Sequence, residues 1–217
     1  LVLGSTVDAN SLTDNAVAGT TIHGNITTNS FQVYNYPITI AGSSVDLNVT
    51  GLSGTSADLT LAGVTTLPVN KSLRLLSTRH IFLNADINTA STAVGTLILN
   101  AGSEIKSGSF ALPNALGIIA NIYVSNFNLT SGSWLQVNPN LPSFQVTTNF
   151  QINSGTMPSV ASIPAQFIRA KGGTGAVGIA YQIVDIYGLQ GIGSTATTLG
   201  YSYQLNSNIK HKNAINL

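Results

Sequence analysis

The acidic side chains are the first candidates for chemistry, because cleavage of a polysaccharide needs carboxylates as acid, base or nucleophile. The chain has seven of them, spread along its length: Asp8, Asp14, Asp46, Asp58, Asp86, Glu104 and Asp185. The densest local group is Asp86 with Arg79 and His80, and we expect Glu104 one coil further along the fold. One hypothesis is therefore a polysaccharide lyase or depolymerase built on Asp86 and Arg79. We favour an ion-paired or solvated patch without turnover and name no catalytic residue.

Other reactive groups form no recognisable site. The absence of cysteine excludes thiolate metal sites, disulfide scaffolds and cysteine catalysis. The histidines, His23, His80 and His211, lack the i, i+4 pairing of a metal site, and no Gly-x-Ser-x-Gly motif occurs. The Gly-rich run after Lys171 indicates a turn between strands, because a phosphate loop has its Lys after the glycines and a helix next. We expect neither a metal nor a cofactor.

Aromatic side chains are the remaining candidates for binding. A flat apolar ring with a polar edge suits a sugar, and the chain is poor in other groups that could hold a ligand. The alternation of apolar residues points Phe31, Phe127, Phe144 and Phe150 into the core. The candidate ligand-binding residues are therefore Trp134, Tyr123, Tyr34 and Tyr36.

Composition narrows the classes of partner. Only 7% of the 217 residues are charged and the net charge is +1, against about 25% charged residues in an ordinary soluble domain. A nucleic-acid binder needs a basic face, so nucleic acid is not an expected partner. No apolar run approaches the roughly 18 residues of a membrane span. The start at Leu1-Val2-Leu3-Gly4 suggests a processed chain or an excerpt.

The elements that must position these residues are short β-strands. Apolar and polar residues alternate with a period of two in brief bursts separated by Gly, Ser, Asn, Thr and Pro. No helical period persists beyond about two turns. The bursts cover residues 38–40, 45–49, 59–61, 73–75, 81–83, 97–99, 122–124, 127–129, 144–146 and 150–152. This is an all-β chain.

The strand lengths favour a parallel β-helix. Strands of three to five residues are short for a sandwich, and the hairpin dipeptides Asn-Gly and Asp-Gly are absent. The Leu-Asn-Ala run at Leu83 recurs sixteen residues later at Leu99, and a weaker version lies 22 residues before it at Leu61. These spacings bracket a coil of about 20 residues. A β-sandwich or jelly roll is the alternative fold.

A family resemblance adds to this prediction. Residues 167–175, 181–192 and 201–205, with Asn208 and Ile209, resemble a junction of filamentous-haemagglutinin-like proteins, and the repeated Leu-Asn-Ala is similar to their β-helical repeats. These are bacterial surface adhesins exported by two-partner secretion. The resemblance implies a right-handed parallel β-helix, a secreted or cell-surface location, an outer-membrane secretion partner and no shared catalytic residues. The chain departs from the pattern at Lys210-His211-Lys212-Asn213, where further repeats would follow.

Two regions and two functions are therefore predicted. Residues 1–160 form the β-helical repeats, and residues 161–217 form a Gly-rich junction and a terminal β segment that continues the solenoid. The favoured function is a rigid, non-enzymatic adhesin segment that attaches to glycans or proteins of host or neighbouring cells. The alternative is the β-helical carbohydrate-active enzyme. Residues 7–19 or 201–217 are expected to cap the ends, and uncovered ends would associate end to end.

Overall fold

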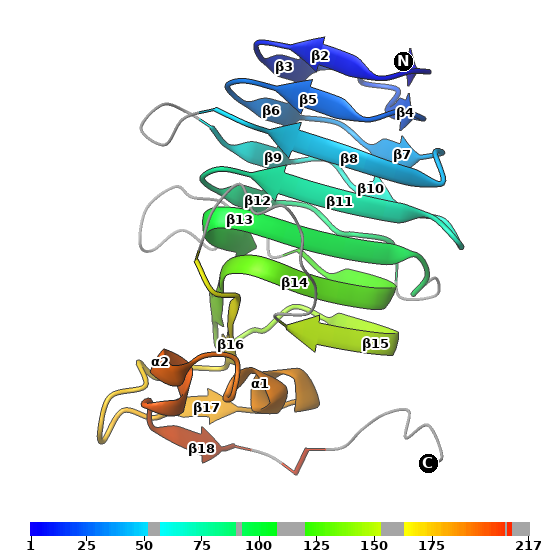
Figure 1. Cartoon of the computed structure of the whole chain (residues 1–217). Helices are drawn as coiled ribbons and strands as arrows, with labels where there is room; N and C mark the ends of the chain where they lie inside the picture. Colours follow the sequence, from blue (N-terminus) through cyan, green and yellow to red (C-terminus); the bar gives the residue numbers. More distant parts are fainter. Residues whose placement is uncertain (52–56, 90–92, 108–119, 153–162, 207, 210–217) are drawn as a thin grey trace.

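The chain folds as a stack of parallel coils, which confirms the predicted all-β parallel β-helix. The computed structural model describes residues 1–51, 57–89, 93–107, 120–152, 163–206 and 208–209. Successive coils lie one above another from the N-terminus down to a C-terminal cap (Figure 1). Neighbouring coils pair in parallel throughout the stack.

Three ladders of strands make the sides of the stack. The first ladder contains β1 (Val2–Leu3), β4 (Thr20–Ile22), β7 (Ile38–Ile40) and β10 (Thr65–Thr66), and bridges at Ile87 and Ile122 extend it. The second contains β2 (Val7–Ala9), β5 (Ile26–Thr28), β8 (Ser44–Val49) and β11 (Ser72–Ser77). The third contains β3 (Leu12–Asp14), β6 (Gln32–Tyr34), β9 (Leu59–Leu61) and β12 (Ile81–Leu83).

The lower coils use longer strands that bend from one side to the next. β13 (Thr96–Ser107) pairs with β11 through its first half and with β12 through its second. β14 (Ile122–Val137) follows, and it pairs with β15 (Phe144–Ile152) and β16 (Gln166–Ala170). The solenoid ladder therefore reaches β16.

The register corrects one of the two sequence echoes. Leu61 pairs with Leu83, so the spacing of 22 residues is a true coil length. Leu99 pairs with Leu75, whereas Leu83 pairs with Ser107. The sixteen-residue echo therefore joins positions on two different sides of the stack and is not a coil repeat.

The core is a continuous apolar column inside the coils. Three-residue strands such as β7 and β9 bury their first and third side chains and turn the middle one outward. The column begins with aliphatic residues such as Ile22 and Leu47 and ends with the rings of Trp134 and Phe167, all at most 1% exposed. Because the inward side chains are almost fully excluded from solvent, the strands are stabilised mainly by apolar burial.

The C-terminal region departs from the prediction after β16. Beyond it come β17 (Tyr181–Ile183), α1 (Ile186–Gly191), α2 (Ala196–Leu199) and β18 (Tyr203–Leu205). β17 and β18 pair only with each other among the described residues, in a separate two-stranded sheet. The predicted boundary at 160/161 and the tail from residue 210 lie outside the described residues.

A helix was not expected in this region. It begins because Asp185, in extended conformation, accepts a hydrogen bond from the Gly188 amide and so caps the first turn. Gly188 and Gly191 lie on the face toward β16, where a Cβ would be 2.4 Å from the Arg169 oxygen and 2.3 Å from the Phe167 oxygen. Two glycines three residues apart thus allow α1 to lie directly on the last strand and cover the end of the solenoid (Figure 1).

Candidate functional site

The structure buries most of the aromatic residues proposed to bind a ligand. The exposed fractions are 1% for Trp134, 0% for Tyr34, 9% for Tyr123 and 36% for Tyr36. A ring that stacks on a sugar needs a free face, so the expectation of exposure is corrected for Trp134, Tyr34 and Tyr123. Of the four, Tyr36 alone keeps a substantial surface.

Inward alternation explains the buried rings. Trp134 faces the axis from β14 and stacks on Phe167, with ring centroids 5.6 Å apart and an interplanar angle of 14°. Tyr34 faces the axis from β6, and its hydroxyl donates to Oε1 of Gln32 at 2.9 Å. Burial, reinforced by the charge of Asp14, raises the pKa of Tyr34 well above its usual range. Both residues thus belong to the core.

The acidic cluster expected around Asp86 does not form. Asp86 accepts hydrogen bonds from the backbone amide and Nδ2 of Asn121 at 2.8 and 3.1 Å. Arg79 instead pairs with Asp58, its Nε donating to Oδ1 at 2.7 Å, and Nδ1 of His80 lies 3.7 Å from the same oxygen. Asp86 and Arg79 therefore have different partners, because each faces a residue on a neighbouring coil.

A second ion pair repeats this arrangement on another side of the stack. Nε of Arg74 donates to Oδ1 of Asp46 at 2.6 Å, across the paired strands β11 and β8. The hydrogen bond to Asp46 raises the pKa of Arg74. Both pairs join adjacent coils at the surface.

The described part of the chain contains no cluster that could hold a metal ion. No group of three or more His, Asp or Glu side chains gathers there. His211 lies outside the described residues. After Lys171 the chain turns through Gly173 and Gly175, both at positive φ, and continues into β17. No helix in the described ranges is long and apolar enough to cross a membrane.

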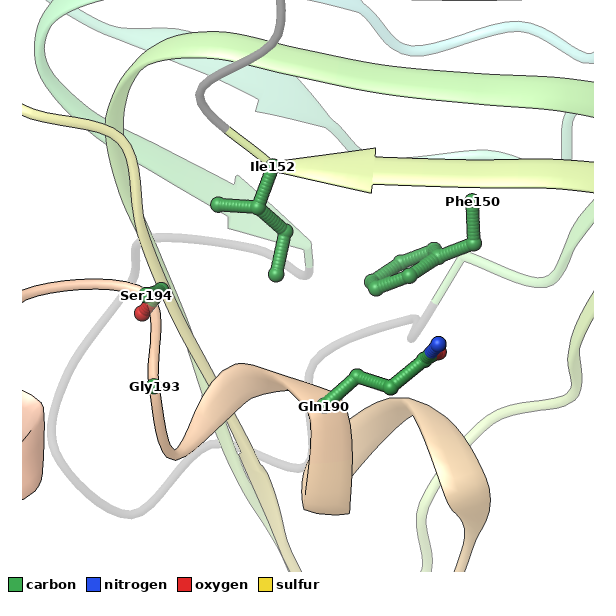
Figure 2. A pocket seen from close by; sticks show the side chains of 5 residues that line it. All are labelled: Phe150, Ile152, Gln190, Gly193 and Ser194. Atoms are coloured by element: carbon green, nitrogen blue, oxygen red, sulfur yellow. The ribbon is translucent and has the colours of Figure 1, made fainter.

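A shallow pocket lies where the solenoid meets its cap (Figure 2). It has a volume of about 440 Å³ and is lined by Phe150 and Ile152 of β15, Gln190 of α1, and Gly193 and Ser194 after the helix. Phe150 and Ile152 are half-buried, because they face the axis of the last coil and α1 covers that coil only in part. None of the described residues that line the pocket carries a charge.

The cap fixes both walls of this pocket. Tyr187 of α1 packs against Phe144 and Phe150, with centroids 4.9 and 5.2 Å apart, and closes the side next to the aromatic core. Ser194 accepts a hydrogen bond from the Phe167 amide at 3.1 Å and donates to the Gly191 oxygen at 2.7 Å. Ser194 is thus an anchor of the loop, and its hydroxyl is already engaged.

Gln190 is the free polar group of the pocket. Its side chain is exposed and makes no hydrogen bond with the described residues. Its role could not be predicted from the sequence, because the alternation indicates no helix here; the one signal is Asp185 as an N-cap before a short run. A second shallow pocket, lined by Asp8, Ala9, Asn10, Thr27 and Asn29, lies at the N-terminal coils.

Comparison with protein-family models, with curated proteins and with solved structures gives no match for this chain.

Proposed function

We propose that this chain is a rigid, non-enzymatic segment of a bacterial surface adhesin or fibre. The observation that carries the proposal is the unbroken apolar column from Ile22 to Phe167, clamped by parallel ladders along its whole length. A quasi-linear stack of this kind resists bending because each coil packs on the next. Such a rod holds a surface at a fixed distance, which suits attachment.

The outward side chains support attachment to uncharged surfaces. On the first ladder Thr21, Thr39 and Thr66 are in register on successive coils. On the second ladder the aligned outward positions are Ser44, Ser72, Thr96, Asn126 and Asn149. Hydroxyl and amide groups both donate and accept hydrogen bonds, so these columns suit the hydroxyls of glycans better than charged ligands.

The family resemblance completes the proposal. A filamentous-haemagglutinin-like protein would be secreted through an outer-membrane partner and would act at the bacterial surface. Its partners would be glycans or proteins of host or neighbouring cells. The paired state of Asp46 and Asp58 also favours a structural role for the charges, since each carboxylate is held by an arginine.

One incubation tests attachment against catalysis. The purified chain is mixed with a panel of neutral and acidic polysaccharides, and retention on the glycan and release of new reducing ends are measured together. We expect retention without new ends. New ends that accumulate over many turnovers and disappear in Asp58→Asn would replace the proposal with an enzyme. No retention on any glycan or on bacterial or host cells would refute attachment.

A further inference from the structure

We infer that the pocket between β15 and α1 binds one neutral sugar unit of a glycan. The inference rests on the proposed attachment function and names the site and ligand class for it. The described lining combines an aromatic ring, an aliphatic side chain and a free amide, and it carries no charge. A sugar ring offers the complementary surfaces, an apolar C–H face and a rim of hydroxyls.

The apolar floor is held rigid by the core. Phe150 lies parallel to Phe127 at 5.4 Å and 11°, and it meets the edges of Phe144 and Phe167 at 6.0 and 5.1 Å. A ring fixed on several sides loses little conformational entropy when a ligand stacks on it. Ile152 extends the floor by one inward position of the same strand (Figure 2).

The polar wall is Gln190. Figure 2 shows its amide end turned toward the ring of Phe150 across the pocket. The amide carries a donor and an acceptor side by side, so it can receive and give a hydrogen bond to two neighbouring hydroxyls of one sugar. Because this side chain has no partner among the described residues, binding breaks no existing contact within that part of the chain.

The charges around the pocket select a neutral ligand. In the described part of the cap, Arg169 and Asp185 pair with each other, so each of these charges is already compensated. A uronic or sialic acid would place its carboxylate beside Phe150 and Ile152, where the described lining offers no cation to offset the loss of hydration. We therefore expect neutral hexoses to bind and acidic sugars to bind more weakly.

Glycine at position 193 gives a sharp test. A Cβ at Gly193 would meet no heavy atom within 4 Å, and its φ lies outside the positive range. Gly193→Leu should therefore fold normally and fill the pocket. Gly4 is equally open at the other end of the solenoid, so Gly4→Leu is the matched control. Gln190→Ala removes the amide from an exposed helical position, and Gln204→Ala on β18 is its control.

The experiment is an NMR titration with methyl glycosides of neutral hexoses and with a hexuronic acid. We expect neutral sugars to shift the resonances of the Gln190 side-chain amide and the Phe150 ring. The affinity, followed at Phe150, should fall about tenfold in Gln190→Ala, be lost in Gly193→Leu and be retained in both controls. The same variants are tested for retention on the glycan panel. Sugar-induced shifts that survive Gly193→Leu, or that never appear at Gln190 and Phe150 while the chain is still retained on glycans, would overturn the pocket assignment and leave the attachment function standing. If none of the proteins, wild type included, is retained on any glycan, the attachment function itself is overturned. A hexuronic acid that binds as well as the neutral sugars would overturn the ligand class.

Discussion

Arg169 donates a hydrogen bond from Nε to Oδ2 of Asp185 at 2.7 Å, and this contact joins the last coil of the solenoid to the helix that covers it. The guanidinium is almost fully buried; it also donates to Oε1 of Gln136 and, at 2.8 Å, to the Pro142 oxygen. Asp185 uses its other oxygen to cap α1 at the Gly188 amide, 2.9 Å away. One ion pair thus couples helix initiation to docking on the core.

Removing Arg169 should detach the cap. Arg169→Met leaves a partly buried carboxylate without its cation and removes the hydrogen bonds that Arg169 donates to Gln136 and to the Pro142 oxygen. We expect a loss of about 3 kcal/mol in the free energy of unfolding, in the range for breaking a buried pair from one side. Denaturant unfolding measures this loss, and hydrogen exchange at residues 186–191 should accelerate before the rest of the chain. Asp185→Asn is the milder comparison, because the amide oxygen still caps α1. A loss below about 0.5 kcal/mol in Arg169→Met would show that the pair does not hold the cap.

The surface ion pairs should matter much less. Arg74 and Asp46 keep side-chain exposures of 31% and 18%, so water and salt screen their attraction. We expect Asp46→Asn to cost about 0–1 kcal/mol and a double-mutant cycle with Arg74→Ala to give a coupling energy in that range. The coupling should fall further in 1 M salt. A coupling above about 2 kcal/mol would mean that the pair sets the register of β8 and β11.

Two aromatic substitutions distinguish core from surface. Trp134→Ala removes the largest fully buried side chain of the described core and should cost about 3–5 kcal/mol. Tyr36→Ala, at 36% exposure, should remain within about 1 kcal/mol of wild type. Thermal unfolding compares the two variants. Equal, small effects would contradict the burial of Trp134 and would restore it as a surface residue.

The side-chain alternation was enough to predict strands, the fold class and part of the core. Phe127 and Phe144 were assigned to the interior from their phase alone, and the structure buries both. Alternation does not decide which face is inside where both faces carry apolar residues, as at Val33 and Tyr34 or at Trp134 and Leu135. Tyr34 and Trp134 were therefore misplaced, although each lies two residues from another buried position of the same strand.

Partners between coils could not be predicted because coil length varies. Paired residues are 18 apart at Thr20 and Ile38 but 35 apart at Ile87 and Ile122. Asp86 consequently meets Asn121, and Arg79 meets Asp58, whereas closeness in sequence had suggested Asp86 with Arg79. The pocket was missed for a related reason: it requires the docking of α1 on β16, which depends on tertiary contacts of Gly188 and Gly191.

Alkaline pH should loosen the two-stranded C-terminal sheet. Burial, with help from the neighbouring Tyr181 and Tyr201, raises the pKa of Tyr203 to about 12. Tyr203 also donates its hydroxyl hydrogen to the Thr198 oxygen at 2.7 Å, which requires the neutral form. Because the pKa is raised from an unfolded value of about 10, the stabilisation is complete below about pH 10 and is lost as the pH rises toward 12. Hydrogen exchange at residues 203–205 between pH 9 and 12, corrected for the pH dependence of the intrinsic exchange rate, measures this loss of stability. Tyr203→Phe should remove most of the pH dependence of this exchange. If the pH profile of that variant is unchanged, a group other than Tyr203 causes the dependence.

The two ends of the solenoid differ, and this difference predicts how copies associate. At the N-terminal end β1, β2 and β3 each pair on one side only among the described residues, and Val2 is 65% exposed. At the other end α1 covers part of the last coil, and the hydroxyl of Tyr187 occupies the edge of β15 by accepting from the Val146 amide at 2.9 Å and donating to the Val146 oxygen at 3.2 Å. An uncovered parallel edge accepts another strand, whereas a capped end does not. We therefore expect association at the N-terminal ends to stop at pairs of copies instead of growing into filaments.

Light scattering over a range of concentrations tests this expectation. The mass should rise to a plateau at twice that of one chain. Val2→Lys places a charge at the exposed edge without disturbing the buried column, so it should keep the chain monomeric with unchanged thermal stability. Thr66→Lys puts the same charge on the middle of the first ladder and should leave the pairing intact. Unlimited growth of the mass would mean that the C-terminal cap opens, and a strict monomer at high concentration would mean that the N-terminal edge is not adhesive.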